Sequence, residues 1–157
     1  MTNDQRASDQ IVSPRDAALL SMRPTTPAMS EAVSALAREQ SAHEPLTLEY
    51  FLHSTLRSIL KLQHESLVRL VAMHVAPHRS SFLQLSIKQQ CDFLTNALKK
   101  EVSLRMLVVG VIVGQFTEAE LVRYTSSSAD KAEIHRRIIE LAARRVCDAR
   151  EAIIALL

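Results

Sequence analysis

The chain has 157 residues, 47% of them hydrophobic, and a formal net charge of +2. This is enough for one domain with a real core, and too little charge for a strongly basic nucleic-acid-binding protein. Two glycines and five prolines leave little material for β-hairpins, so an all-α fold is favoured. The first thirty residues lack the apolar stretch of a signal peptide, which predicts a cytoplasmic protein whose cysteines, Cys91 and Cys147, stay reduced and buried.

The N-terminal region is expected to fold only weakly. Residues 1–29 are rich in polar residues and proline and predict a disordered tail, with one short helix possible at Pro14 to Met22 after Ser13 as N-cap. Residues 30–45 predict a weak helix and a linker, because their apolar positions are mostly alanine. The helical domain is therefore expected to span residues 46–157.

The first long helix of this domain is expected to begin after Thr47 as N-cap and to run to about Val75, before Pro77. Its apolar residues recur at spacings of three and four, which predicts one continuous apolar stripe. Three long amphipathic helices cannot fully surround one another, so part of this stripe is expected to face a partner. The candidate interface residues on this helix are Leu56, Ile59, Leu67 and Leu70.

The second long helix is expected to begin after Ser86, which has a capping-box pattern with Gln89, and to run unbroken to about Gly114, where a residue tolerant of positive φ can end it. Its last part, LRMLVVGVIVGQF at residues 104–116, is apolar on all sides. This predicts a buried central segment, and helix rather than strand because it continues an amphipathic run. The uncharged part, residues 106–117, is well short of the roughly 20 residues of a membrane span.

Gly110 and Gly114 are the only glycines of the chain and lie four residues apart on one helical face. The missing side chains allow a second helix to approach closely. We expect the C-terminal helix to pack across this face, and a self-association groove is the alternative. Both glycines are therefore candidate interface residues.

The segment Thr117 to Glu120 is the most specific local signal, because both residues fit a capping box. It predicts a sharp reversal followed by a short helix to about Thr125. Asp130 with Glu133 repeats the spacing and predicts a last helix from Lys131 to about Ala155. The expected architecture is a small all-α bundle of two long antiparallel helices plus this C-terminal helix.

Catalytic and metal-binding patterns are weak in this chain. A metal-dependent enzyme that uses His64, His74 and His78 is the third hypothesis, but Pro77 lies between the last two and no third ligand appears at the expected spacing. No nucleophile motif or phosphate-binding glycine loop is present in the sequence. We therefore expect a protein that is not an enzyme and that has no cofactor or resident metal.

The arginines of the last helix support two further predictions. Arg136, Arg137 and Arg144 fall together on its polar side, interleaved with Glu140, which favours a solvated face with ion pairs over a nucleic-acid contact. Arg145 projects into the apolar stripe, where a charge needs a partner, and we expect it to mark the edge of an interface.

The function expected from these features is a non-catalytic helical interaction protein, a dimeric regulator that binds another protein through an apolar helix face. A regulator of a transcription factor is one concrete form. The alternative is a DNA-binding transcriptional regulator that uses the arginine-rich C-terminal helix.

Overall fold

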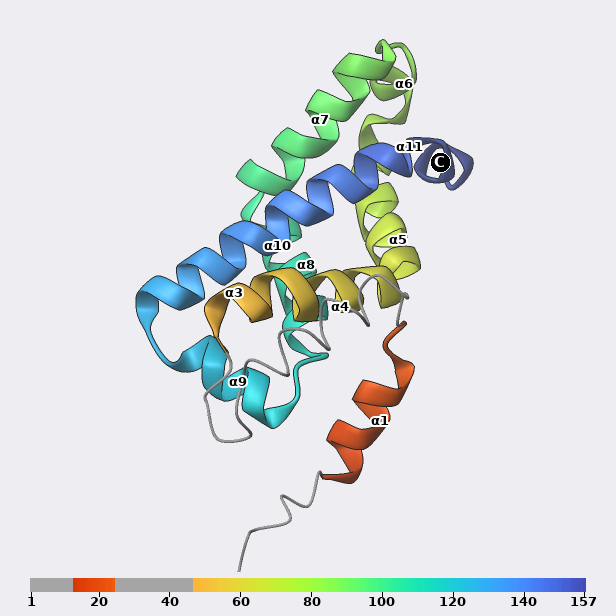
Figure 1. The fold of residues 1–157 in the computed structure, drawn as a ribbon. Coiled ribbons are helices and arrows are strands. Elements are labelled where there is room, and N and C mark those ends of the chain that lie inside the picture. Colours follow the sequence, from red (N-terminus) through yellow and green to blue (C-terminus); the bar gives the residue numbers. More distant parts are fainter. Residues whose placement is uncertain (1–12, 25–46) are drawn as a thin grey trace, which may run out of the picture.

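Helices make up all of the secondary structure in the part of the chain that the structure describes, residues 13–24 and 47–157 of this computed structural model (Figure 1). The small all-α bundle predicted from the sequence is thereby confirmed. The helix expected within residues 30–45 lies outside the described residues. The helices are, in chain order, α1 (Pro14–Met22), α3 (Leu48–Tyr50), the π-helical η1 (Phe51–Thr55), α4 (Leu56–Leu62), α5 (His64–Val75), the 3₁₀-helical η2 (Ala76–His78), α6 (Arg79–Leu83), α7 (Ile87–Lys100), α8 (Val102–Val113), α9 (Glu118–Thr125), α10 (Ser128–Asp148) and α11 (Arg150–Ala155).

The helix starts follow the predicted caps closely. Ser13 caps α1 and Thr47 caps α3 with their side-chain oxygens. Ser86 with Gln89, and Thr117 with Glu120, each form both hydrogen bonds of a capping box. These predictions are confirmed because a cap depends on residues three positions apart, whatever the rest of the fold does. The last helix differs, since Ser127 caps α10 in place of the predicted Asp130.

The first long helix is divided into segments that change direction. A π-helical turn, η1, separates α3 from α4, and Gln63 interrupts the helix between α4 and α5 with φ −91° and ψ 15°. The two segments α4 and α5 therefore lie at an angle to each other (Figure 1). Each segment can then direct its own apolar face into the core.

The second long helix is also divided, although it contains no proline. Glu101 has φ −78° and ψ 103°, which ends α7 and begins α8. The prediction of an unbroken helix is wrong at this position, because packing of the two segments outweighs the local helix preference. Gly114 does end α8, but with φ −61°, so positive φ is not the reason for glycine there.

Helix α10 organises the bundle and is the long rod that crosses the molecule in Figure 1, with α7 on one side and α4 on the other. It also contacts α5, α8, α9 and α11. Its buried positions recur at helical spacing and face the common core of the domain. These positions are Ile134, Ile138, Ile139, Ala142, Ala143 and Val146.

A disulfide joins Cys91 of α7 to Cys147 of α10, which lie 56 positions apart in sequence and whose Cα atoms are 5.1 Å apart. The prediction of two reduced, buried cysteines is wrong on both points, because the two cysteines form this disulfide and both side chains are only partly buried. Sequence spacing holds no information on this pair, because α7 and α10 meet only in the tertiary structure. The bond therefore reinforces a helix contact that apolar packing already forms.

Within residues 13–24 and 47–157, no helix combines the length and the apolar character that crossing a bilayer requires. The apolar helix α8 has 12 residues. This agrees with the length argument made from the sequence.

Candidate protein interface

The interface residues predicted on the first long helix lie mostly inside the molecule. Leu56, Ile59 and Leu67 are each 0% exposed and belong to the core. Leu70 is half-buried. A partner cannot reach the first three while the bundle is folded, so they do not form an apolar docking surface.

Helix α8 supplies such a surface, because its two faces have different surroundings. One face packs in the core through Leu104, Val108, Val109 and Ile112. The opposite face exposes apolar side chains to solvent. Its exposed positions are Val102 (61%), Ser103, Met106 (52%), Leu107 (47%) and the two glycines, Gly110 and Gly114.

The exposed positions Ser103, Leu107, Gly110 and Gly114 are spaced four, three and four residues apart. This spacing aligns them along one seam, as in helices that pack against a partner helix. We term these four residues the α8 seam; Met106 flanks it. No charged side chain belongs to the seam. The strip that it presents to solvent is therefore uncharged.

The two glycines of the seam differ in their surroundings. A Cβ atom at Gly110 would meet none of the described residues within 4 Å, while one at Gly114 would lie 3.1 Å from the carbonyl oxygen of Gly110. The expected packing of the C-terminal helix across this face is therefore wrong. Helix α10 does contact α8, but it leaves Gly110 exposed.

Helix α1 reaches the end of the α8 seam through polar contacts. The guanidinium of Arg15 donates from Nη2 to the carbonyl oxygen of Gly114 (3.3 Å) and from Nη1 to that of Phe116 (3.0 Å). Asp16 accepts from the amide of Glu118 through Oδ2 (3.2 Å). Cations near the C-terminus of a helix and anions near an N-terminus are favourable, and α1 supplies both to the turn between α8 and α9.

A second arginine of this segment enters a buried ion pair. Arg23 donates to both carboxylate oxygens of Glu120, at 2.6 and 2.7 Å, and to the carbonyl oxygen of Gln115 at 2.7 Å. The side chains of Arg23 and Glu120 are 9% and 7% exposed. Glu120 also accepts from the amide of Thr117 (2.8 Å) and from the hydroxyl of Thr55 (3.4 Å). One carboxylate thus caps α9 and holds α1.

The predicted DNA-contacting arginines of α10 are paired with carboxylates. Arg136 lies 2.6 Å from Glu133 and 3.5 Å from Glu140, while Arg137 and Arg144 lie 3.0 and 3.4 Å from Glu140. Hydrogen bonds from Arg136 and Arg137 lower the pKa of Glu133 and Glu140 respectively. Each carboxylate therefore stays charged and neutralises part of the stripe.

Arg145, the predicted interface edge, is half-buried. Its guanidinium has no hydrogen bond or ion pair with any residue that the structure describes. It is neither fully exposed nor neutralised, so its role at an interface stays a prediction.

Of the three histidines named for a metal site, two lie together and the third lies apart. His74 and His78 line one surface pocket, and His64 is not among the residues that line it. In the described ranges, no three histidine, cysteine or acidic side chains form a group able to hold a metal ion. His135 instead bonds the hydroxyl of Tyr124 at 2.5 Å, and burial together with the nearby charges of Lys131 and Arg105 lowers its pKa.

Sequence reasoning missed the contacts of Arg15 and Arg23. Both lie in a polar segment without periodicity, and their partners are about a hundred residues away in the chain. The only signal in the sequence was the capping box, which predicts that the carboxylate of Glu120 is hydrogen-bonded but does not predict that an arginine pairs with it. No protein-family model, curated protein or solved structure matches this chain.

Proposed function

We propose that this protein is a non-catalytic helical interaction protein that forms a homodimer through the α8 seam and regulates a protein partner. The observation that carries this proposal is the exposed apolar face of α8, with Leu107 and Met106 about half exposed beside Gly110. Burial of such a face against a second helix is favourable in proportion to the apolar area removed from water.

A second copy of the chain is the occupant that this face fits best. The four seam residues carry no charge, so they can meet their own copies around a two-fold axis without opposing like charges. The space over Gly110, which none of the described residues fills within 4 Å, allows the backbones of two α8 helices to approach closely, as small residues at helix contacts generally do. Leu107 of each copy would then pack beside the glycines of the other.

The oligomeric state of the purified full chain tests this proposal. We expect light scattering to give a dimer, and Leu107→Glu to give a monomer, because a carboxylate would be buried at the seam. Val122→Glu is the matched control, since Val122 is 64% exposed on α9, outside the seam. A monomeric wild-type chain at all accessible concentrations would overturn the dimer.

A second variant separates dimerisation from folding. Gly110→Ala should stabilise the fold by roughly 0.5–1 kcal/mol, because alanine is a better helix former and the added Cβ meets no described residue. The same methyl group should weaken the dimer by holding the two backbones apart. A variant that is more stable and equally dimeric would place the contact elsewhere.

The regulated partner is proposed to be another protein, for which a transcription factor is one concrete form. The support is the exposed apolar surface outside the seam, including Met73 and Ile87, at 62% and 65% exposure. The Met73→Lys or Ile87→Lys variant should no longer capture the partner proteins that the wild-type chain captures from a lysate, while it still forms the dimer.

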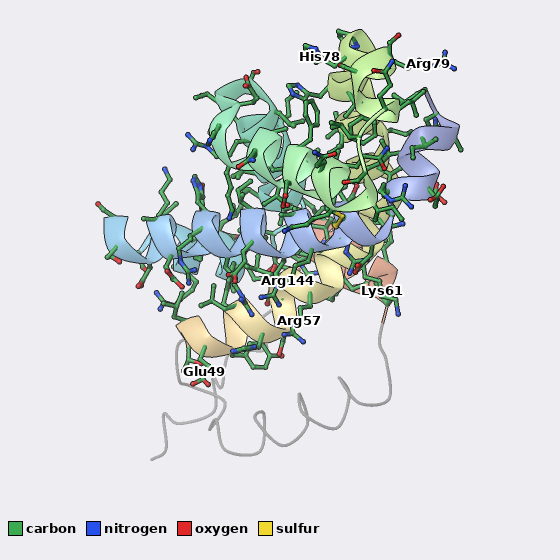
Figure 2. All side chains as sticks on the ribbon, turned by 90° about the horizontal axis from the view of Figure 1, so that it is seen from above. Glu49, Arg57, Lys61, His78, Arg79 and Arg144 are labelled. Atoms are coloured by element: carbon green, nitrogen blue, oxygen red, sulfur yellow. A yellow bond between two sulfur atoms is a disulfide. The ribbon has the colours of Figure 1, made fainter. Side chains whose placement is uncertain are left out.

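A DNA-binding regulator is the second candidate function. It is favoured by basic side chains on two adjacent helices, Arg57 and Lys61 of α4 and Arg144 of α10 (Figure 2). The pairing of Arg136, Arg137 and Arg144 with glutamates weighs against it, because phosphate neutralisation needs free cations. Absence of a DNA mobility shift at low salt would eliminate this candidate.

The cytoplasmic location also stays a proposal, and the disulfide weighs against it. Cytosolic thiols are kept reduced, whereas disulfides persist in oxidising compartments. Acid-quenched extracts of the native cells, probed with a thiol-alkylating reagent, decide between the two. Alkylated Cys91 and Cys147 would support the cytoplasm, and protected cysteines would reject it.

A further inference from the structure

An open pocket of about 320 Å³ lies beside the end of α5 and the C-terminal half of α7. We term this site the α5–α7 pocket. Six of the side chains that line it offer groups able to contact a ligand. Its volume falls at the lower end of the roughly 300–1,000 Å³ typical of small-molecule sites. The six side chains are those of His74, His78, Phe93, Asn96, Lys100 and Glu101.

One side of the pocket is apolar and held in place. The ring of Phe93 packs edge-on against the buried ring of Phe82 at a centroid distance of 5.4 Å, and against His78 at 6.1 Å. His78 lies at the outer edge of the molecule, next to Arg79 (Figure 2). A ring fixed on two sides offers a ready surface for an apolar or aromatic group.

The other side carries two opposite charges that are not used within the described chain. Lys100 ends α7 and Glu101 follows it, at the bend before α8. Neither side chain forms a hydrogen bond or ion pair with a described residue. The Asn96 amide is likewise unpaired among these residues. In α10, by contrast, the carboxylates of Glu133 and Glu140 are both paired with arginines.

We propose that the α5–α7 pocket binds a small zwitterion with an apolar body, that is, a free α-amino acid with an apolar side chain. The ligand carboxylate pairs with Lys100 and its ammonium with Glu101, while its side chain packs on Phe93. The Asn96 amide and the imidazoles of His74 and His78 supply further hydrogen-bonding groups. This site lies outside the α8 seam, so it is independent of the proposed dimer.

Two other ligand classes fit the same residues less well. A simple anion would pair with Lys100 but would face the carboxylate of Glu101, which costs affinity. A metal ion would find two histidines and one carboxylate at the rim, which do not form a three-ligand group in the described residues. Only a ligand with both charges pairs with both side chains.

Titration of the full chain followed by NMR tests the proposal with three probes that share one body. L-phenylalanine carries both charges, 3-phenylpropionate lacks the ammonium and 2-phenylethylamine lacks the carboxylate. We expect L-phenylalanine to shift the Asn96 side-chain amide and to bind roughly tenfold tighter than either analogue, as one charge-assisted contact commonly provides.

Substitutions then assign each contact. Lys100→Met should reduce L-phenylalanine affinity to that of 2-phenylethylamine, and Glu101→Gln should reduce it to that of 3-phenylpropionate. Lys99→Met and Glu65→Gln are the matched controls, because both residues are exposed and neither lines the pocket. Equal binding of the three probes, no shift at Asn96, or equal losses from Lys99→Met and Lys100→Met would each overturn the proposal.

Discussion

Helices α1 and α10 are held against the same bundle by different forces. Helix α10 buries a full apolar face in the core and is tied to α7 by the disulfide. Helix α1 buries only Leu19 and leaves Leu20 and Met22 about half exposed. Its attachment comes instead from Arg15, Asp16 and Arg23, which bond the turn between α8 and α9 and the first residues of α9.

These two kinds of attachment predict different ways for α1 and α10 to separate from the bundle. Apolar burial is non-directional and is lost in proportion to exposed area, so α10 should separate only when the whole core opens. A buried ion pair depends on both partners at once, and removal of one leaves the other unpaired. Helix α1 should therefore be released as a unit, with the remaining bundle intact.

The largest effect should come from the disulfide that α10 has and α1 lacks. Closure of a loop of 56 residues predicts a loss of about 4 kcal/mol in the free energy of unfolding for the Cys91→Ser/Cys147→Ser variant. Urea unfolding measures it, and a reductant should move the wild-type midpoint to that of the variant. An unchanged midpoint under reducing conditions would show that packing alone holds α10.

Truncation of one apolar side chain in each helix should give the next largest contrast. Ile138→Ala removes a side chain that is 0% exposed and should cost about 3 kcal/mol, from lost burial and a residual cavity. Leu20→Ala, at 48% exposure in α1, should change stability by less than about 0.5 kcal/mol. Similar losses in both variants would mean that α1 shares the core.

The attachment of α1 is tested by a pair of arginine substitutions. Arg23→Gln should cost about 2 kcal/mol, because Glu120 is left without its buried partner until α1 leaves. Hydrogen exchange should then show faster exchange in Pro14–Met22 than in α10. Arg136→Gln is the control, since its side chain is 62% exposed and solvent screens the ion pairs of such a side chain. Unchanged exchange in α1 would exclude the ion pair as its main support.

The smallest effect should be a pH dependence centred on His135 of α10. Burial lowers the pKa of this histidine below its usual 6.5, with smaller effects from Lys131 and Arg105. The unfolded chain then binds the proton more strongly, so stability should fall as the pH decreases below about 6.5 and stay flat above it. Urea midpoints between pH 7.5 and about 5 measure it, above the range where acidic side chains titrate. His135→Gln should remove the slope, and a slope of opposite sign would contradict the burial of the ring.

Local signals in the sequence predicted the helix starts and the all-α class. The boxes at Ser86–Gln89 and Thr117–Glu120 lie where expected, because both partners of each box are three residues apart. The bend at Glu101 was not predictable in this way, since neither Lys100 nor Val102 is a helix breaker. It follows from the need of α7 and α8 to place different faces in one core.

The residues of the candidate interface were likewise predictable from the sequence only in part. The sequence identified Gly110 and Gly114 as a helix-contact face, and Gly110 does lie in a position open to one. It placed Leu56, Ile59 and Leu67 at an interface, whereas the core covers them fully. An apolar stripe has the same pattern whether a neighbour from the same chain or another copy covers it. Only the tertiary arrangement separates the two cases.

The sequence by itself therefore determined the helical class, the positions of most caps and the apolar character of α8, because these depend on residues within one or two turns of each other. The tertiary structure alone decided which face of α8 stays exposed, that Cys91 meets Cys147 and that Arg23 reaches Glu120. Such contacts join residues tens of positions apart. Their formation depends on how whole helices pack, which no local pattern encodes.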